Sequence, residues 1–354
     1  MSCKNSTDSA LVIGPVLKEV PNYQATKRRF LSDINLKVLN MKNTSRQDFR
    51  KIRVAAVQAE PVFLDLDATT KLACELIKQA SEQKADLIAF PEAFIPTFPN
   101  WYESIGEGQM SRELDKRLFL NSVEVPGEHI QAIADACKLG SINAVVGINE
   151  RINGTTGTMY NTHVHINREG TIVSKHQKYV GTTGERQVHG PGKTGHLNSF
   201  KTDFGVVSGL ICGENSNPLG MYAAAVNYPV VHVASWPSYF ADYFPMHHAI
   251  HTASAGLAYS LKCFAVNAVS RISEAYIEEV AQTTEQREFL TEQRALKKGA
   301  LILNPLGQVI AQGCGSDDDL LYADLDLSDV IIPKMFIDPA GHYNRPELFA
   351  ELFE

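Results

Sequence analysis

The sequence predicts an α/β protein in which a single domain holds two β-sheets with helices on the outside. Residues 52–59 form a short β-branched apolar run, residues 67–83 carry apolar side chains at helical spacing, and residues 86–90 are a second apolar run. This strand–helix–strand order favours parallel strands joined by a crossover helix. Further apolar runs continue along the chain, and their number indicates two sheets. The pattern alone leaves the order of the strands open.

The remaining elements are expected on the same criteria. Residues 128–139 and 218–227 are predicted to be helices, the first of them capped by Gly140. Residues 168–170 are typical of a hairpin turn. The charged segment 273–298 has Leu and Ile at loose helical spacing, which predicts a helical insertion on the surface. Strands are expected at 143–149, 159–166, 171–174, 204–212, 229–234, 264–270, 300–303 and 320–325.

The first fifty residues differ from the rest of the chain. Residues 1–50 are polar, mixed in charge and weakly periodic, so we expect an extension that is partly ordered or packs on a partner subunit. Its acidic residues argue against a transit peptide, and Pro15 interrupts the apolar stretch 10–17 that a secretory signal would need. We therefore expect one domain over residues 51–349, including the insertion at 273–298 and a C-terminal tail.

Composition and charge narrow the class of protein. The chain has 354 residues with 44% hydrophobic residues and a formal net charge of −7, which is typical of a soluble globular protein and argues against a general affinity for nucleic acid. No apolar run is long enough to span a membrane. None of the six cysteines forms a C-x-x-C pair, so free thiols in a reducing compartment are expected. A cytoplasmic protein is the prediction.

Cys212 is the strongest candidate nucleophile. It ends a predicted buried strand, and in α/β folds chemistry is usually placed at the ends of strands. Gly213, Glu214 and Asn215 follow it as candidates for binding or positioning the reacting group, and Gly213 offers an unshielded N–H to an oxyanion. Pro218 suits the first turn of the next helix, whose nearby start would favour a thiolate. The cysteines in apolar periodic runs are predicted to be core residues: Cys74, Cys137 and Cys263.

Two further polar residues follow predicted strands. Glu92 lies between Phe90 and Phe94, and burial against aromatic rings would raise the pKa of its carboxyl toward that of a general base near neutral pH. Lys178 follows the run at 171–174, and a lysine near a cysteine lowers the thiol pKa and stabilises a tetrahedral intermediate. Lys175 is a competitor for this role.

These segments resemble the Glu–Lys–Cys motifs of the nitrilase superfamily, and they occur in that family's order. Lys178 follows Glu92 by 86 residues and Cys212 follows Lys178 by 34, which is also typical of the family. The run GLICGEN at 209–215 closely matches the nucleophile motif of true nitrilases. Further matching stretches extend the resemblance over about residues 51–349: 53–58 (RVAAVQ), 175–178 (KHQK), 184–186 (GER), 217–219 (NPL), 299–307 (GALILNPLG) and 341–347 (GHYNRPE).

The resemblance implies a fold and a set of roles. The fold is a four-layer αββα sandwich of two packed sheets with outer helices, assembling into dimers and often spirals, with no metal and no organic cofactor. Cys212 would be the nucleophile, Glu92 the general base, Lys178 rather than Lys175 the group that stabilises the intermediate, and Glu185 the residue that positions the lysine and the substrate.

Candidate binding residues are less sharply defined. His247 and His251 are four residues apart on a probable helix, but the pattern lacks the Glu of a zinc motif, so a metal site is not predicted. His247 is instead expected at the mouth of the substrate pocket or at a subunit contact. Trp236 and Pro237 are expected near the substrate. The following aromatic residues form either a substrate wall or a packed loop: Tyr239, Phe240, Tyr243 and Phe244.

The leading functional hypothesis is a nitrilase that converts a nitrile to a carboxylic acid and ammonia. The alternatives with the same three residues are an amidase and an enzyme that stops at the amide. A non-catalytic binding protein is the alternative from another class, and the presence of all three residues argues against it. One sequence does not distinguish aliphatic from aromatic nitriles.

Overall fold

The structure is a computed structural model of the chain, and it describes residues 48–241, 244–296, 299–349 and 352. Residues Gln47–Asn344 form one compact unit, and the chain end from Arg345 belongs to a second, small unit. The prediction for residues 1–50 lies almost entirely outside the described residues.

The first sheet, sheet A, has six strands among the described residues, in the order β12-β1-β2-β3-β4-β5. The predicted crossover is confirmed, because β1 pairs in parallel with β2 and the helix α2 (Leu66–Glu82) connects them. The strands β4 and β5 form the expected hairpin. The bounds are β1 (Lys51–Val57), β2 (Leu87–Ala89), β3 (Asn143–Arg151), β4 (Met159–Ile166), β5 (Ile172–Gln177) and β12 (Leu320–Asp326).

The second sheet, sheet B, also has six strands in the described part of the chain, in the order β11-β10-β9-β8-β7-β6. Its centre is parallel, since β7 pairs with β8 and β8 with β9 in the same direction. These three strands are mostly apolar because they are largely covered on both faces, and their polar residues Ser208, His232, Ser235 and Asn267 are buried. The bounds are β6 (Ser199–Thr202), β7 (Gly205–Ile211), β8 (Val231–Trp236), β9 (Phe264–Val269), β10 (Leu301–Leu303) and β11 (Val309–Gln312).

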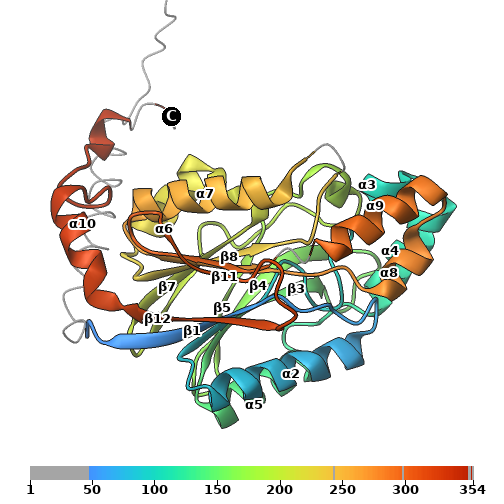
Figure 1. The fold of residues 1–354 in the computed structure, drawn as a ribbon, viewed down its shortest axis with the longest axis horizontal. Helices are drawn as coiled ribbons and strands as arrows, with labels where there is room; N and C mark the ends of the chain where they lie inside the picture. The colour runs from blue at the N-terminus through green and yellow to red at the C-terminus, as the bar shows by residue number, and fades with distance from the viewer. Residues whose placement is uncertain (1–47, 242–243, 297–298, 350–351, 353–354) are drawn as a thin grey trace, which may run out of the picture. The chain divides into compact units, whose positions relative to one another are not determined.

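The two sheets pack face to face between two helical layers, as Figure 1 shows. The helices α2 and α5 (Glu128–Gly140) bury one apolar face each on sheet A. The helices α6 (Pro218–Ala225) and α7 (Met246–Leu261) cover the outer face of sheet B. Between the sheets, Val54 and Leu87 of sheet A meet Val233 and Val266 of sheet B in one buried cluster. The predicted αββα arrangement is therefore confirmed.

A group of short helices lies at one end of the sandwich (Figure 1). The helices α3 (Trp101–Ile105), α4 (Gln109–Leu120), α8 (Glu274–Val280) and α9 (Thr284–Ala295) share a buried cluster that includes Trp101, Leu118, Ile277 and Leu290. The helical insertion at 273–298 is thus two helices, and it packs on α3 and α4 rather than standing free of the core. Four shorter helical segments complete the described chain: η2 (Thr183–Gln187), η3 (Cys212–Ser216), η4 (Leu327–Val330) with α10 (Ile331–Phe336), and η5 (Pro346–Leu348).

The predicted cap at Gly140 is wrong. The helix α5 includes Gly140, and Ser141 ends it with a left-handed φ of 49°. A β-carbon on Gly140 would lie 2.8 Å from the Cβ of Ser81 in α2, so this glycine is needed for the close approach of the two helices. The close packing of α2 and α5, which no local pattern reveals, explains the residue.

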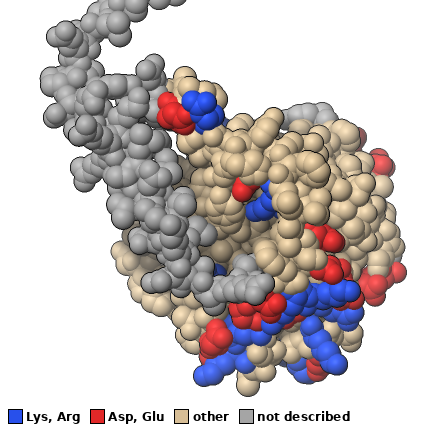
Figure 2. Space-filling view, turned by 90° about the vertical axis from the view of Figure 1, so that its left-hand side faces the viewer, with Lys and Arg blue, Asp and Glu red and all other residues tan. Residues whose placement is uncertain are grey.

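The surface where β1 begins is strongly charged. Figure 2 shows acidic and basic side chains gathered side by side near the lower edge of this face. Arg50 and Arg168 each pair with both Asp86 and Asp203, which ties sheet A to the β6–β7 turn of sheet B. No described helix is both long and apolar enough to cross a membrane.

Candidate active site

The predicted site residues come from the carboxyl ends of three strands. Glu92 follows β2, Lys178 follows β5 directly, and Cys212 follows β7. All three are buried, with exposed fractions of 0%, 3% and 6%. Strand β5 continues to Gln177, three residues beyond the predicted end, so Lys178 lies at the end of a strand and not within a loop. The fold thus brings together residues that are far apart in the sequence.

Lys178 is held between two carboxylates. Its Nζ donates hydrogen bonds to Oε1 of Glu92 at 2.7 Å and to Oε2 of Glu185 at 2.6 Å. Glu185 lies in η2, and its Oε2 also accepts the backbone N–H of Thr182 at 2.8 Å, which fixes the loop. Two anions around one cation in a buried site leave a single net negative charge when all three groups are ionised.

Burial and this ion cluster set the protonation states. Burial raises the pKa of Glu92 to about 7; the Lys178 ammonium opposes this rise and the Glu185 carboxylate reinforces it. For Glu185, burial favours the neutral form, but Lys178 and His189 outweigh it and hold its pKa below the usual range. Burial likewise disfavours the charged form of Lys178, yet Glu185, Glu92 and Cys212 raise its pKa. Lys178 stays protonated, and Glu92 is poised to exchange a proton near neutral pH.

Cys212 has an unusual backbone and a protected thiol. Its φ of +51° lies in the left-handed region, and it is the first residue of η3. Burial and then the Glu92 carboxylate raise the pKa of the thiol, although Lys178 and a hydrogen bond from the Gly213 N–H oppose them. The net effect is a Cys212 thiol that stays protonated in the resting site, so a thiolate would form there only with a base nearby.

The residues after Cys212 play two different parts. The Gly213 N–H points to the sulfur, as predicted for a donor near the reacting atoms. The Glu214 carboxylate instead accepts three donors: the Ile211 N–H at 2.9 Å, the Tyr179 N–H at 2.6 Å and His176 Nε2 at 2.9 Å. Glu214 thus ties the segment before Cys212 to the segment after Lys178.

Asn215 and the helix that follows also support the nucleophile. The Asn215 amide donates to the carbonyls of Leu210 and Cys212 at 3.1 and 2.9 Å, so it holds the backbone at the nucleophile. The helix α6 begins at Pro218 as predicted, and the Asn217 side chain caps it.

The predicted pocket residues separate into two groups. Trp236 is buried in the same apolar cluster as Cys212 and donates its indole N–H to Asn267 at 2.8 Å. Pro237 is buried next to it. His247 is exposed and lines a different cavity together with His251 and Cys314, so the structure does not bring it to the Glu92 cluster.

The structure also bears on the metal site, the aromatic residues and Lys175. No group of three or more His, Cys, Asp or Glu among the described residues is placed to hold a metal ion. Tyr239 packs in the core cluster beneath the short helices, in line with the packed-loop interpretation, and Tyr243 lies outside the described residues. Lys175 pairs with Glu150 and not with Glu92 or Glu185.

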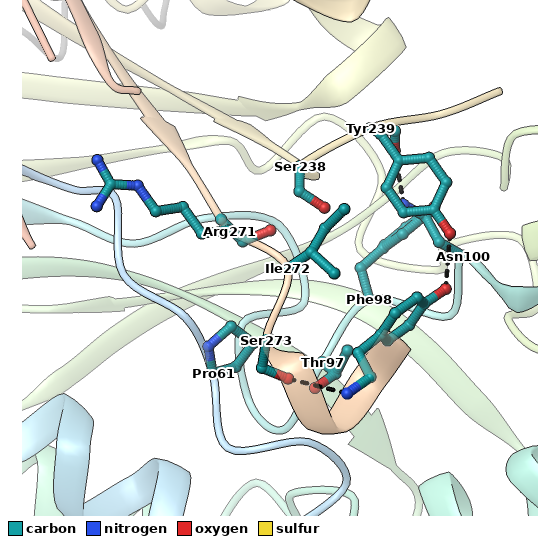
Figure 3. Close-up of a pocket in the computed structure, with 11 residues that line it drawn as sticks. Pro61, Thr97, Phe98, Asn100, Ser238, Tyr239, Arg271, Ile272 and Ser273 are labelled. Carbon is teal, nitrogen blue, oxygen red and sulfur yellow. Dashed lines mark hydrogen bonds between the residues drawn. The ribbon is translucent and has the colours of Figure 1, made fainter. Parts of the chain in front are cut away.

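A narrow cavity lies between the loop that follows Glu92 and the loop that follows Trp236 (Figure 3). Phe98 lines it, and the ring of Phe98 lies 5.8 Å from the Lys178 Nζ. Asn100 on one side donates to the backbone oxygen of Tyr239 on the other at 2.6 Å, which joins the loop after Glu92 to the loop after Trp236. Both loops therefore border the site.

Three functional neighbours were missed by sequence reasoning. The Asn161 side chain bonds to both Glu92 and Glu185. His189 Nδ1 lies 3.3 Å from Glu185 Oε1, and its Nε2 lies 3.0 Å from Asn149 Oδ1. The available signal was weak: Asn149 and Asn161 are polar residues in strands that are predicted to be buried, where a polar side chain needs a partner, but each strand holds other polar residues as well.

Comparison with known proteins identifies the family of this chain. The family model for carbon–nitrogen hydrolases matches residues 53–331. A nitrilase of Bacillus sp. (strain OxB-1) is 34% identical over 311 residues, covering 87% of this chain and 89% of that protein. An aliphatic nitrilase of Rhodococcus rhodochrous is 32% identical over 305 residues, covering 84% of this chain and 81% of its own length.

A solved structure shows the same fold. A Saccharomyces cerevisiae member of branch 10 of the nitrilase superfamily superposes with a TM-score of 0.63 at 19% identity, covering 83% of this chain and 97% of that one. Together with the family match, this settles the class: the chain belongs to the carbon–nitrogen hydrolase family, within the nitrilase superfamily. Its relatives at 32–34% identity are nitrilases by name.

Proposed function

We propose that this protein is a nitrilase that hydrolyses a nitrile to the carboxylic acid and ammonia, with Cys212, Glu92 and Lys178 as its catalytic residues. The observation that carries the proposal is the buried Glu92–Lys178–Glu185 cluster with Cys212 within its electrostatic reach. The names of the nitrilase relatives support the choice of substrate class. We propose no metal and no organic cofactor for this chemistry.

The first half of the reaction forms a covalent intermediate. Glu92 takes the proton of the Cys212 thiol, and the sulfur adds to the nitrile carbon while the nitrile nitrogen receives the proton, giving a thioimidate. Water then adds to this carbon to form a tetrahedral intermediate. The ammonium of Lys178 stabilises the negative charge that develops on it, and the Gly213 N–H is a second donor.

The second half releases the two products. Glu92 takes the hydroxyl proton of the tetrahedral intermediate and passes it to the nitrogen as the carbon–nitrogen bond breaks, so ammonia leaves and a thioester to Cys212 remains. Glu92 then deprotonates a second water, which attacks the thioester carbon, and the carbon–sulfur bond breaks to regenerate the thiol and free the acid. Two waters are consumed for each nitrile. Glu185 takes no proton because its pKa is lowered, so it serves to position Lys178 and the substrate.

The test is ammonia release from a panel of aliphatic and aromatic nitriles and their matched amides, with Cys212→Ala alongside. We expect ammonia from one or more nitriles and a loss of at least about 10³-fold in the variant, because no other group replaces a covalent nucleophile. The matched control is Cys263→Ala, because Cys263 is a buried cysteine that packs against α6 and α7. Its rate should stay close to that of the wild type.

The outcomes distinguish the alternatives. Release from amides but not nitriles would make the protein an amidase with the same three residues. An amide as the end product would indicate hydration only. Silence of the wild type on both panels would contradict the nitrilase proposal and favour a binding protein.

We also propose that the protein acts in the cytoplasm and self-associates into dimers and larger spirals. A reducing compartment suits a reaction that depends on a free thiol, and the described cysteines are all unbridged. We propose that residues 1–50 and the insertion at 273–298 lie at subunit contacts. Deleting residues 1–47 should reduce the particle mass measured by light scattering, and an unchanged mass would contradict this role.

A further inference from the structure

Asn161 lies at the centre of the acidic cluster. It is in β4, its side chain is buried, and its Nδ2 donates one hydrogen bond to Glu92 Oε1 and one to Glu185 Oε1, each at 2.8 Å. Its backbone oxygen accepts the N–H of Lys178 at 2.8 Å. This one residue therefore contacts every charged member of the cluster except the thiol.

The contact makes the two oxygens of Glu92 unequal. Oε1 accepts hydrogen bonds from both Lys178 and Asn161. Oε2 is buried and has no hydrogen-bond partner among the described residues. A buried carboxylate oxygen without a hydrogen-bond donor destabilises the folded protein. A general base, however, needs one oxygen that is free to receive a proton.

Lys178 alone would not enforce this arrangement. Its ammonium has three donors on a flexible stem and could bind either oxygen of Glu92. An amide is different, because its two N–H bonds are fixed in one plane at a set angle. In Asn161 the two hydrogens go to the two different carboxylates, so the rigid amide sets the orientation of Glu92 relative to Glu185.

We propose that Asn161 is a positioning residue that anchors Oε1 of Glu92 and so presents Oε2 as the oxygen that takes protons from Cys212 and from water. This inference rests on the proposed function for the reaction, but its main consequence, the reactivity of the Cys212 thiol, does not require a substrate. The charged and titratable groups around Glu92 are Lys178, Glu185 and Cys212, with His189 reaching the cluster through Glu185.

The test is the variant Asn161→Leu, which keeps the size of the side chain and removes the donors. The matched control is Thr162→Val on the same strand, since Thr162 is equally buried and bonds to Glu150 instead of the cluster. Two quantities are measured across pH: the rate of Cys212 alkylation by iodoacetamide, read by mass spectrometry of the Cys212 peptide, and kcat and KM for the nitrile that the wild type hydrolyses.

In Asn161→Leu we expect kcat to fall about 100-fold with KM changed less than about threefold. The pH at which Cys212 alkylation reaches half its maximum should rise, because the Glu92 anion has lost a donor. Thr162→Val should leave both pH profiles unmoved. If Asn161→Leu does not fold, Asn161→Ser is used, which keeps a polar side chain too short to reach both carboxylates.

Three results would overturn the proposal. One is an alkylation profile in Asn161→Leu that matches the wild type; another is a kcat loss no larger than that of Thr162→Val. The third is a fall in activity that reflects only a smaller folded fraction by circular dichroism. A wild type without turnover but with the expected shift in alkylation would reject the nitrilase proposal and leave the positioning role of Asn161 in place.

Discussion

Two clusters of charged residues lie at opposite ends of the sandwich, one at each end of strands such as β2 and β5. At the amino-terminal ends, Arg168 bonds to Asp86 at 3.2 Å and to Asp203 at 3.0 Å, and these side chains are 22–30% exposed. At the carboxyl ends, Lys178 bonds to Glu92 and Glu185 with every side chain at 2% or less. The chemistry of the pairs is alike, and their access to water differs.

That difference decides what each cluster is for. Water and salt screen the partly exposed pairs, so they contribute little to stability. In the other cluster burial raises the pKa of Glu92 to about 7, against the pull of the Lys178 ammonium and with that of the Glu185 carboxylate. Burial therefore gives the ion cluster a carboxyl that can exchange a proton near neutral pH. It also makes the cluster sensitive to the loss of any one member, because a buried charge without its partner is destabilising.

The largest effect should follow from removing the cation of the buried cluster. In Lys178→Met, two carboxylates remain buried without their cation, so we expect a stability loss of about 3–5 kcal/mol at a pH where both stay ionised. We also expect kcat to fall at least about 10³-fold, because the cation that stabilises the intermediate is gone. The checks are urea unfolding and ammonia release. Lys175→Met is the control: Lys175 is 30% exposed and Glu150, although buried, keeps the hydrogen bonds from Thr162 and Gln177, so we expect a smaller stability loss of about 1–3 kcal/mol and an unchanged kcat. Equal losses in both variants would break the comparison.

Lowering the pH should destabilise the protein through its buried histidines. Burial lowers the pKa of His165 and His232 to about 3 and also lowers that of His163. The unfolded chain binds protons at these sites below about pH 6.5 and the folded chain does not, so stability should fall as the pH drops from about 6.5 towards 3. Each histidine contributes up to about 1.4 kcal/mol per pH unit.

Glu92 has the opposite effect on the pH dependence of stability. Its pKa is raised to about 7, so between the usual carboxyl range and pH 7 the folded chain holds a proton there that the unfolded chain has lost. Its contribution is lost as the pH rises through 7. Urea unfolding between pH 4.5 and 7 measures the net slope. His165→Gln should make that slope shallower, and an unchanged slope would show that His165 is not a neutral buried group.

The smallest effect is expected at the exposed cluster. In Arg168→Leu we expect a loss of about 1 kcal/mol, since Arg50 still pairs with both aspartates, and no change in the rate of ammonia release. In the wild type, raising the salt concentration should reproduce part of this loss. A drop in kcat in Arg168→Leu would mean that the exposed cluster affects the buried one, and it would contradict the view that the two clusters act independently.

The parts of the fold that were predictable are those with continuous apolar patterns. Strands β1, β7, β8 and β9 are largely buried, so their sequences are mostly apolar and their positions were confirmed. The edge strands β6 and β11 were missed because they are short and mixed in sequence, and only Phe200 of their residues is buried. Helix α4 was missed for a similar reason: only Ser111, Leu114 and Leu118 of its twelve residues are buried.

The site divides in the same way. Glu92, Lys178 and Cys212 could be found because each follows a strand in a recognisable motif, and the sandwich brings the three together. Asn161 and His189 could not be found, since their roles depend on hydrogen bonds to residues far away in the sequence. His247 looked like a pocket residue, but its side chain faces another cavity, and only the packing of α7 on sheet B decides which way it points.

The order of the three residues along the chain bears on how the enzyme is made. During synthesis Glu92 leaves the ribosome first and Cys212 last, and the strand β7, which ends one residue before Cys212, pairs with β8, which emerges later still. Until sheet B has formed against sheet A, Cys212 is a thiol without Glu92 beside it. On the proposed mechanism, a chain that stops before β8 should therefore have no hydrolase activity, and the new enzyme should become active only when most of its chain has folded.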